Sequence, residues 1–407
     1  MISDISSEII ERINGLVDSR GGVEEDELYN IIDCILLEEK YSVIGLSDKL
    51  SLRRNIFNMI KRFDILQNIL DDDSVTEIMI NGYKDIFIER GGRIERYEGS
   101  FSSREKLLDI VQRIAGRTNK IVNESTPIID TRLEDGSRVN IVMNPIAMDG
   151  PAVTIRKFYN NPLTMERLIG LGAITPEAAR FLKDLVRAKY NIFISGGTGS
   201  GKTTFLNALS DYIPKDERII TIEDSAELKL IGVDNLVRLE ARSANMEGRN
   251  AVTIRDMIRA SLRMRPSRII VGEVRGGEAL DMLQAMGTGH DGSLSTGHAN
   301  GAEEMLMRLE TMVLMAVDMP VGAIRSQIAS SVDIIVHLGR LRDGSRKVLK
   351  IAEIKELERS QTGEHIVLNT LYEFMQEGVM EDGRVAGSLK KTQAELIHKE
   401  KLLAAAL

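Results

Sequence analysis

A glycine-rich segment in the second half of the chain has the residue types and spacing of a phosphate-binding loop. It follows the apolar run 192–194 and precedes a stretch with helical spacing, which is the setting that such a loop requires. The segment consists of Gly196, Gly197, Thr198, Gly199, Ser200, Gly201, Lys202, Thr203 and Thr204. Glycines let backbone N–H groups converge on phosphate oxygens, and the start of a helix favours negative charge. We therefore predict that the segment binds ATP and Mg²⁺, with Lys202 on the β- and γ-phosphates and the Thr203 hydroxyl on the metal.

Two acidic residues stand at the ends of later apolar runs. Glu223 follows the run 219–222, and Glu273 follows the run 269–272. The carboxyl ends of strands in an α/β sheet line the ligand crevice, and a phosphate loop needs a nearby carboxylate to hold magnesium or orient water. We predict that both glutamates are catalytic and that Glu273 also contacts the metal. The alternative for each is an ordinary helix cap or turn residue.

A glycine- and histidine-rich stretch, 289–300, contains His290 and His298. An imidazole there could sense or polarise the γ-phosphate, or it could be a hydrogen-bonded turn residue. A zinc pair is disfavoured, because no cysteine or carboxylate completes a ligand set at suitable spacing. Arg255, Arg259 and Arg263 recur every four residues, which predicts either a solvated helix face or a stripe that reaches across a subunit boundary.

Composition limits the class of protein and its compartment. With 407 residues and 43% hydrophobic content, the chain can form two or three globular domains. The lone cysteine, Cys34, cannot form an internal disulfide, which favours a reducing cytoplasm. The N-terminus does not have the pattern of a signal peptide, and no apolar run has membrane-spanning length, so we expect a cytoplasmic protein that meets a membrane through partners. A net charge of -8 disfavours nucleic acid as the general ligand.

The elements that must position these residues fall into successive stretches. Helical spacing predicts a helical segment over 1–70, an α+β domain follows over 71–158, and a linker occupies 159–175. Alternating apolar runs and helical stretches over 176–387 predict an α/β domain with a largely parallel sheet, and a charged helix is expected over 388–407. Hairpins are expected at Asn81-Gly82, Gly91-Gly92, Asp135-Gly136 and Asp343-Gly344. Ser102 with Glu105 predicts a capping box, and Thr175-Pro176 predicts a helix start.

Four ordered motifs resemble those of the type II and type IV secretion-ATPase superfamily, closest to the CpaF-like ATPases of Tad pili. They are ISGGTGSGKTT, TIEDSAEL, RMRPSRIIVGEVRG and TGHDGSLSTGHAN, and the match covers about 75–343. The resemblance implies a RecA-like P-loop NTPase domain in a homohexamer. It also implies that Glu223 lies in the acidic box, Glu273 is the Walker B carboxylate and His298 lies in the histidine box. Arg138 and Arg156 match the arginines of the preceding domain that reach the nucleotide phosphates.

The resemblance predicts a hexameric motor that hydrolyses Mg·ATP to power Tad/Flp-type pilus assembly or protein secretion. Its expected partners are inner-membrane platform proteins, and its expected location is the cytoplasmic face of that membrane. One alternative is a RecA-like nucleic-acid translocation ATPase, which would need basic loops bearing aromatic residues; the 4% aromatic content disfavours it. A second alternative is a non-motor P-loop kinase, which normally lacks a long N-terminal domain.

Overall fold

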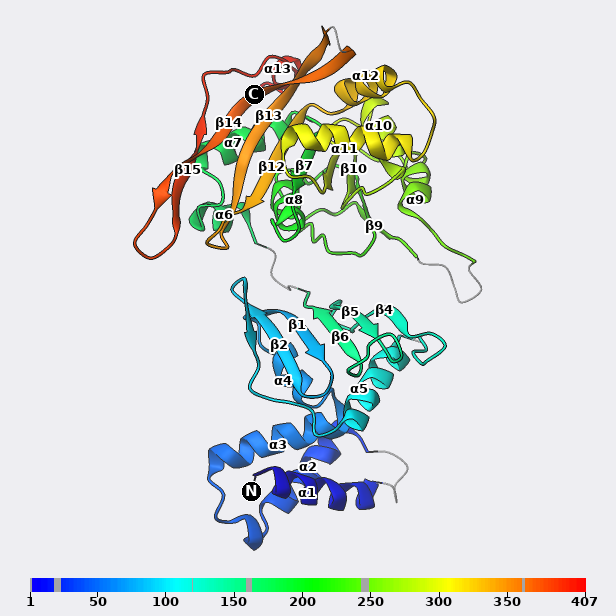
Figure 1. Ribbon diagram of the computed structural model, residues 1–407, viewed down its shortest axis with the longest axis vertical. Helices are drawn as coiled ribbons and strands as arrows, with labels where there is room; N and C mark the ends of the chain where they lie inside the picture. Colours follow the sequence, from blue (N-terminus) through cyan, green and yellow to red (C-terminus); the bar gives the residue numbers. More distant parts are fainter. Residues whose placement is uncertain (1, 18–22, 119, 159–162, 243–248, 361–362) are drawn as a thin grey trace. The chain divides into compact units, whose positions relative to one another are not determined.

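The computed structural model describes residues 2–17, 23–118, 120–158, 163–242, 249–360 and 363–407 (Figure 1). The chain divides into two compact units, Met1–Asn160 and Asn161–Leu407. Among the helices of the described ranges, none combines the length and the apolar character that a membrane crossing needs.

The first unit begins with helices packed on their own apolar core. Apolar residues recur every three or four positions, so each helix turns one apolar side inward. The buried side chains include Ile9, Ile13, Leu28, Ile32, Ile56 and Phe57. The helical elements are α1 (Ile2–Val17), α2 (Glu25–Leu36), the 3-10 helix η1 (Glu39–Tyr41), α3 (Leu46–Lys61) and α4 (Ile65–Leu70). The predicted N-terminal helical segment is therefore present.

The rest of the first unit is a six-stranded antiparallel sheet with helix α5 (Arg104–Arg117). Its strands, in the spatial order β3-β2-β1-β6-β5-β4, are β1 (Val75–Asn81), β2 (Asp85–Arg90), β3 (Arg93–Arg96), β4 (Ile128–Arg132), β5 (Arg138–Val142) and β6 (Ala152–Arg156). The hairpins predicted at Asn81-Gly82, Gly91-Gly92 and Asp135-Gly136 are confirmed. The predicted cap is wrong by one residue: α5 begins at Arg104, so Ser103 rather than Ser102 accepts the N–H of Lys106, at 3.2 Å.

The second unit is built on a nine-stranded mixed sheet, in the order β15-β14-β13-β12-β7-β11-β10-β8-β9. The six strands β12, β7, β11, β10, β8 and β9 pair in parallel. The strands β12, β13, β14 and β15 pair antiparallel. The predicted hairpin at Asp343-Gly344 is confirmed, because it connects β12 to β13. The strands are β7 (Ile192–Gly196), β8 (Ile219–Glu223), β9 (Leu236–Glu240), β10 (Arg268–Val271), β11 (Leu294–Gly297), β12 (Ile334–Arg340), β13 (Arg346–Ser360), β14 (Gly363–Val379) and β15 (Val385–Lys391).

Helices cover both faces of the parallel strands, which explains why those strands read as continuous apolar runs (Figure 1). Ile192 and Ile194 of β7 belong to one core, and Phe193 between them belongs to the other. The first core contains α6 (Met165–Gly170), α7 (Pro176–Arg187) and α8 (Lys202–Ser210). The second contains α9 (Ile254–Ser261), α10 (Glu278–Gly287), α11 (Ala302–Leu314) and α12 (Val321–Ser331). Thr175 caps α7 as predicted, accepting the N–H of Ala178.

Two sequence predictions need correction in this unit. The linker expected over 159–175 contains helix α6, because Met165 and Leu168 are buried in the first core; residues 159–162 lie outside the described residues. The helix expected over 388–407 is limited to α13 (Glu400–Ala404). Its beginning belongs instead to β15, because residues 385–391 pair with β14 and bury Leu389 against the sheet.

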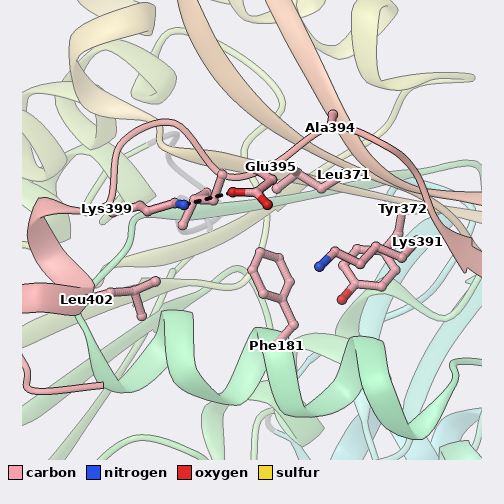
Figure 2. Close-up of a pocket in the computed structure, with 9 residues that line it drawn as sticks. Phe181, Leu371, Tyr372, Lys391, Ala394, Glu395, Lys399 and Leu402 are labelled. Atoms are coloured by element: carbon pink, nitrogen blue, oxygen red, sulfur yellow. Dashed lines mark hydrogen bonds and ion pairs between the residues drawn. The ribbon is translucent and has the colours of Figure 1, made fainter.

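After β15 the chain turns back toward α7 and leaves a cavity of about 240 Å³ between the two (Figure 2). Phe181 of α7 faces this cavity, and Lys399 pairs with Glu395 beside it at 3.0 Å. The cavity is lined by Phe181, Leu371, Tyr372, Lys391, Ala394, Glu395, Leu396, Lys399 and Leu402. None of the residues predicted to do chemistry is in this lining, so the candidate site lies elsewhere in the unit.

Candidate nucleotide site

The glycine-rich loop connects the end of β7 to the start of α8, as the sequence predicts. Gly199 and Gly201 have φ values of +69° and +92°, in the left-handed region that favours glycine. A Cβ atom on Gly196 would lie 2.5 Å from Ser200 Oγ and 2.6 Å from the carbonyl oxygen of Leu338. The loop can therefore form this tight turn into the helix only with glycine at these positions. Its geometry suits a phosphate group held at the N-terminus of α8.

Lys202, the first residue of α8, lies back over this loop and is only 7% exposed. Its Nζ atom donates to the carbonyl oxygens of Gly196 and Gly197, both at 3.0 Å. The same atom is 3.2 Å from Nδ1 of His298. The ammonium group is thus held at the phosphate side of the loop by neutral acceptors.

His298 follows strand β11 and connects Lys202 to Glu273. Its Nε2 atom is 2.9 Å from Glu273 Oε1, while Arg275 Nη2 donates to the other carboxylate oxygen, also at 2.9 Å. Because an ammonium group can only donate, Nδ1 of His298 must accept, and the ring proton of the neutral form is on Nε2, facing the carboxylate. Burial lowers the pKa of His298, although Glu273 acts in the opposite direction, and this favours the neutral ring. Three predicted site residues therefore form one chain of contacts.

A cavity of about 330 Å³ opens beside this chain of contacts. Its lining comes from the loop, the end of β10, the end of β11 and α11. The lining residues are Thr198, Val274, Arg275, His298, Arg308 and Met312. Two of these, Arg275 beyond the end of β10 and Arg308 within α11, were not predicted as site residues, since an arginine at either place has no sequence pattern of its own. Their positive charge suits an anionic ligand.

Glu223, at the end of β8, is buried to 2% exposure. Its Oε2 atom accepts the backbone N–H groups of Glu227 at 2.7 Å and Leu228 at 2.9 Å. No donor within the described ranges reaches its Oε1 atom. Burial raises the pKa of Glu223, against the effect of the two N–H groups. A Cβ on Gly272 would lie 3.0 Å from Glu223 Cγ, so the glycine before Glu273 makes room for this carboxylate.

Replacing Glu223 with glutamine is expected to stabilise the second unit at neutral pH. Because the folded-state pKa is raised, the stability that Glu223 contributes is fully present below its ordinary pKa of 4.5 and is lost as the pH rises through the folded-state value. The buried Glu223 carboxylate has one oxygen that receives no hydrogen bond from the described residues, which costs on the order of 1 kcal/mol of stability. Glutamine removes the negative charge and with it this cost. Thermal unfolding of both proteins at about pH 7 and about pH 5 should show a gain that shrinks at the lower pH. A variant less stable than the wild type at both values would contradict this account.

The arginine stripe has a partner inside the chain. Arg255 and Arg259 of α9 each donate through Nε to the carboxylate of Asp281 on α10, at 2.7 Å, and Asp281 is 4% exposed. The sequence analysis predicted a solvated face or a contact across a subunit boundary, and it did not predict this ion pair within the chain. The ion pair depends on how α9 and α10 pack together. His290 lies on the loop before β11, where its carbonyl oxygen accepts the Ser293 hydroxyl at 2.7 Å, and its ring Nδ1 atom has no hydrogen-bond partner among the described residues.

Arg138 and Arg156 are neighbours in the sheet of the first unit, whereas the phosphate loop belongs to the second. They are directly paired on β5 and β6, so their side chains leave the same face of the sheet. Arg132 on β4, which the sequence analysis missed, pairs with Arg138 in the same way. Only the strand register reveals this row of three arginines. Like charges directly opposite one another are unfavourable on their own, so the row suits an anionic ligand.

A strand, a glycine-rich loop and a helix that begins with lysine, with carboxylates at the ends of neighbouring parallel strands, define a P-loop nucleotide-binding α/β domain. Comparison with known proteins narrows the class. A family model described as "Type II/IV secretion system protein" matches residues 61–384. The type IV secretion system protein VirB11 of Brucella suis is 34% identical over 296 residues, which cover 66% of this chain and 82% of that protein.

Two further proteins agree with this match. A Mycobacterium tuberculosis protein named for conjugal transfer is 34% identical over 300 residues, covering 72% of this chain and 85% of its own. The structure of the Legionella pneumophila ATPase DotB, at 22% identity, shares the fold, with a TM-score of 0.54 over 72% of this chain and 81% of that one. The chain belongs to the type II/IV secretion system ATPase family. It is a secretion or conjugation ATPase, an enzyme that binds and hydrolyses nucleoside triphosphate, and the resemblance seen in its motifs is confirmed at that level.

Proposed function

We propose that the chain is a hexameric motor that hydrolyses Mg·ATP to power Tad/Flp-type pilus assembly or a related protein secretion machine. The observation that carries the proposal is the chain of contacts from Lys202 through His298 to Glu273 beside the phosphate loop. The proposed location is the cytoplasmic face of the membrane, and the proposed partners are inner-membrane platform proteins. The four motifs that resemble those of the CpaF-like ATPases support this choice of machine.

In this proposal Lys202 binds the β- and γ-phosphates. Its ammonium group donates to two carbonyl oxygens and lies beside the His298 imidazole, which are neutral acceptors. Phosphate oxygens carry negative charge and make stronger, charge-assisted hydrogen bonds. Bound nucleotide would therefore draw the ammonium group away from His298, and the histidine could report the presence of the γ-phosphate to Glu273.

Mg²⁺ bound with ATP would neutralise phosphate charge, and the Thr203 hydroxyl and the Glu273 carboxylate are the oxygen ligands that we assign to it. In the described part of the chain, no group of three or more His, Cys, Asp or Glu side chains gathers at one point. This agrees with a magnesium ion that takes one or two protein ligands and completes its shell with phosphate and water.

The two glutamates are proposed to orient the attacking water. Glu223 offers Oε1, a buried acceptor that no donor in the described residues fills, and Glu273 lies at the end of a strand that pairs with β8. Burial raises the pKa of Glu223, and a buried carboxylate of this kind is suited to accept a proton near neutral pH. The Nε2 atom of the neutral His298 ring lies 2.9 Å from Glu273 Oε1, and Arg275 donates to Oε2, so the two neighbours limit where the carboxylate can lie before the nucleotide arrives.

We further propose that Arg138 and Arg156, together with Arg132, contact the phosphates of a nucleotide bound to a neighbouring subunit of the ring. A row of three guanidinium groups on one sheet face can neutralise the charge that develops on the γ-phosphate. Closed rings built from one kind of contact place the same two surfaces at every seam, so each seam would contain one complete site.

Mixing two inactive variants tests this arrangement. Lys202→Ala and Arg156→Ala should each be almost inactive, whereas an equal mixture that exchanges subunits should recover activity. In a random ring about a quarter of the seams combine an intact lysine with an intact arginine from the neighbour. Turnover per subunit in the mixture is therefore expected to reach roughly a quarter of the wild-type value.

The size of the assembly must be measured in the same samples by light scattering. A mixture that forms rings and shows no recovery would mean that the arginine and the lysine act within one subunit. Wild-type turnover per subunit that stays constant down to concentrations where only monomers remain would overturn the ring itself.

A further inference from the structure

Charge is distributed very unevenly along the chain. Residues 1–50 contain 12 aspartates and glutamates but only 4 lysines and arginines, and the remaining residues contain 49 of each kind. The formal net charge of -8 therefore belongs entirely to the first 50 residues. The ATPase fold itself is balanced, so the acidic character is a property of the N-terminal helices.

These helices also carry the most exposed apolar side chains of the first unit's helical part. We use the name α2–α3 edge for residues 37–50, which join α2 to the first turns of α3. On this edge Leu37 is 79% exposed, Val43 92%, Leu46 76% and Leu50 57%. Single exposed apolar residues are ordinary, but four within 14 residues form a patch of the kind that marks an interaction site.

The patch is not the side of α3 that makes the core. Leu52 and Ile56 bury that side, at 1% and 0% exposure, whereas Leu46 and Leu50 are one helical turn apart and share another side. Lys49 Nζ donates to the carbonyl oxygen of Leu36 at 2.8 Å, which holds the end of α2 against the start of α3. Leu37 is therefore brought close to the α3 residues.

The edge carries exposed acidic groups, and two of the nearby cations are paired with glutamates. Glu39 and Asp48 are exposed on the same edge. Lys40 pairs with Glu8, and Arg12 pairs with Glu38 through two contacts of 2.9 and 2.7 Å. The edge thus presents apolar side chains together with the two exposed carboxylates of Glu39 and Asp48.

We propose that the α2–α3 edge is the docking surface for a cationic amphipathic helix of a partner protein. The apolar side of such a helix would cover Val43, Leu46 and Leu50, and its lysines or arginines would meet Glu39 and Asp48. The same negative charge repels nucleic acid and anionic lipid. Segments rich in lysine and arginine typically flank membrane spans on the cytoplasmic side, so we assign the partner as a membrane protein. This assignment, unlike the docking surface itself, rests on the proposed function.

A second copy of this chain is a poorer match. Its arginine-rich helix α9 buries its apolar residues Met257 and Ile258 in the second unit, at 5% and 0% exposure. The Arg255 and Arg259 side chains of that helix are bonded to Asp281. We therefore assign the cationic helix to another protein and test the second copy below.

The test measures binding of a fluorescent peptide to the full chain by anisotropy. The probe is an amphipathic peptide of about 18 residues with leucine and lysine at helical spacing. A scrambled peptide of the same composition and a peptide with glutamate in place of lysine are the matched probes. The protein variants are Leu46→Gln/Leu50→Gln, which keeps the charge, and Glu39→Gln/Asp48→Asn, which keeps the apolar patch. Leu314→Gln/Met315→Gln is the control, since those residues are 45% and 64% exposed in the second unit.

Each edge variant is expected to weaken binding of the amphipathic peptide at least about tenfold, while the control binds as the wild type does. Lys202→Ala should also bind normally, so a failure of the proposed ATPase mechanism would leave this result unchanged. Equal binding of the scrambled peptide, or unchanged affinity in both edge variants, would overturn the proposal. So would a wild-type dimer in light scattering that Leu46→Gln/Leu50→Gln abolishes, because the edge would then join two copies of this chain.

Discussion

Lys202→Ala is expected to lower ATP turnover at least about a thousandfold and to weaken nucleotide binding. In the proposed mechanism this side chain binds the phosphates, and it lies over the loop, 7% exposed, where its Nζ donates to the carbonyl oxygens of Gly196 and Gly197. Removing it leaves the negative charge of the γ-phosphate without its nearest compensating group. Phosphate release measures turnover, and fluorescent nucleotide titration measures binding. If the proposed role in pilus assembly holds, the same variant should abolish surface pili seen by electron microscopy in the source cells.

The control for this variant is Lys183→Ala, which removes an exposed lysine of α7. It should hydrolyse ATP at the wild-type rate. Thermal unfolding must show that Lys202→Ala is folded, since only a folded variant informs on chemistry. Turnover by folded Lys202→Ala within about tenfold of the wild type would rule out the assigned role of this lysine.

The features that the sequence predicted well are those encoded by neighbouring residues. The phosphate loop needs glycines in the left-handed conformation and a helix after it. The eight consecutive residues 196–203 contain these glycines and begin the helix, so a local pattern predicts the loop. The hairpins at Asn81-Gly82 and Asp135-Gly136 are equally local. Glu223 and Glu273 could be expected at one edge because both end strands of a parallel sheet, and β8 indeed pairs with β10.

The features that it missed depend on which distant segments pack together. The contact between Lys202 and His298 exists because β11 lies beside β7, an order that no local pattern states. Arg132 joins the arginine row through strand register, and Asp281 captures two arginines through helix packing. Residues 388–407 were expected to be helical, but residues 388–391 belong to strand β15 because they pair with β14.

Glu273→Gln is expected to separate nucleotide binding from hydrolysis. Glutamine keeps the size of the side chain, and its single carbonyl oxygen can still accept from Arg275, so the site should largely keep its shape. It removes the negative charge that we assign to the magnesium shell and to the attacking water. We expect ATP to bind within about threefold of the wild-type affinity and turnover to fall at least about a hundredfold. Such a variant should hold ATP without consuming it, which a titration followed by product analysis would show.

Glu278→Gln provides the matched control, because Glu278 is close in sequence and one of its oxygens, Oε1, accepts the backbone N–H groups of Arg275 and Gly276, at 2.7 and 2.9 Å. Glutamine can accept both, so turnover should stay within about threefold of the wild type. If Glu273→Gln retained wild-type turnover, Glu223 would become the carboxylate that orients water, since its Oε1 is buried and unfilled among the described residues. If Glu273→Gln lost ATP binding instead, the carboxylate would act mainly by holding His298 and Arg275 in place. The two glutamates would then differ in role because one has its charge balanced by neighbours and the other does not.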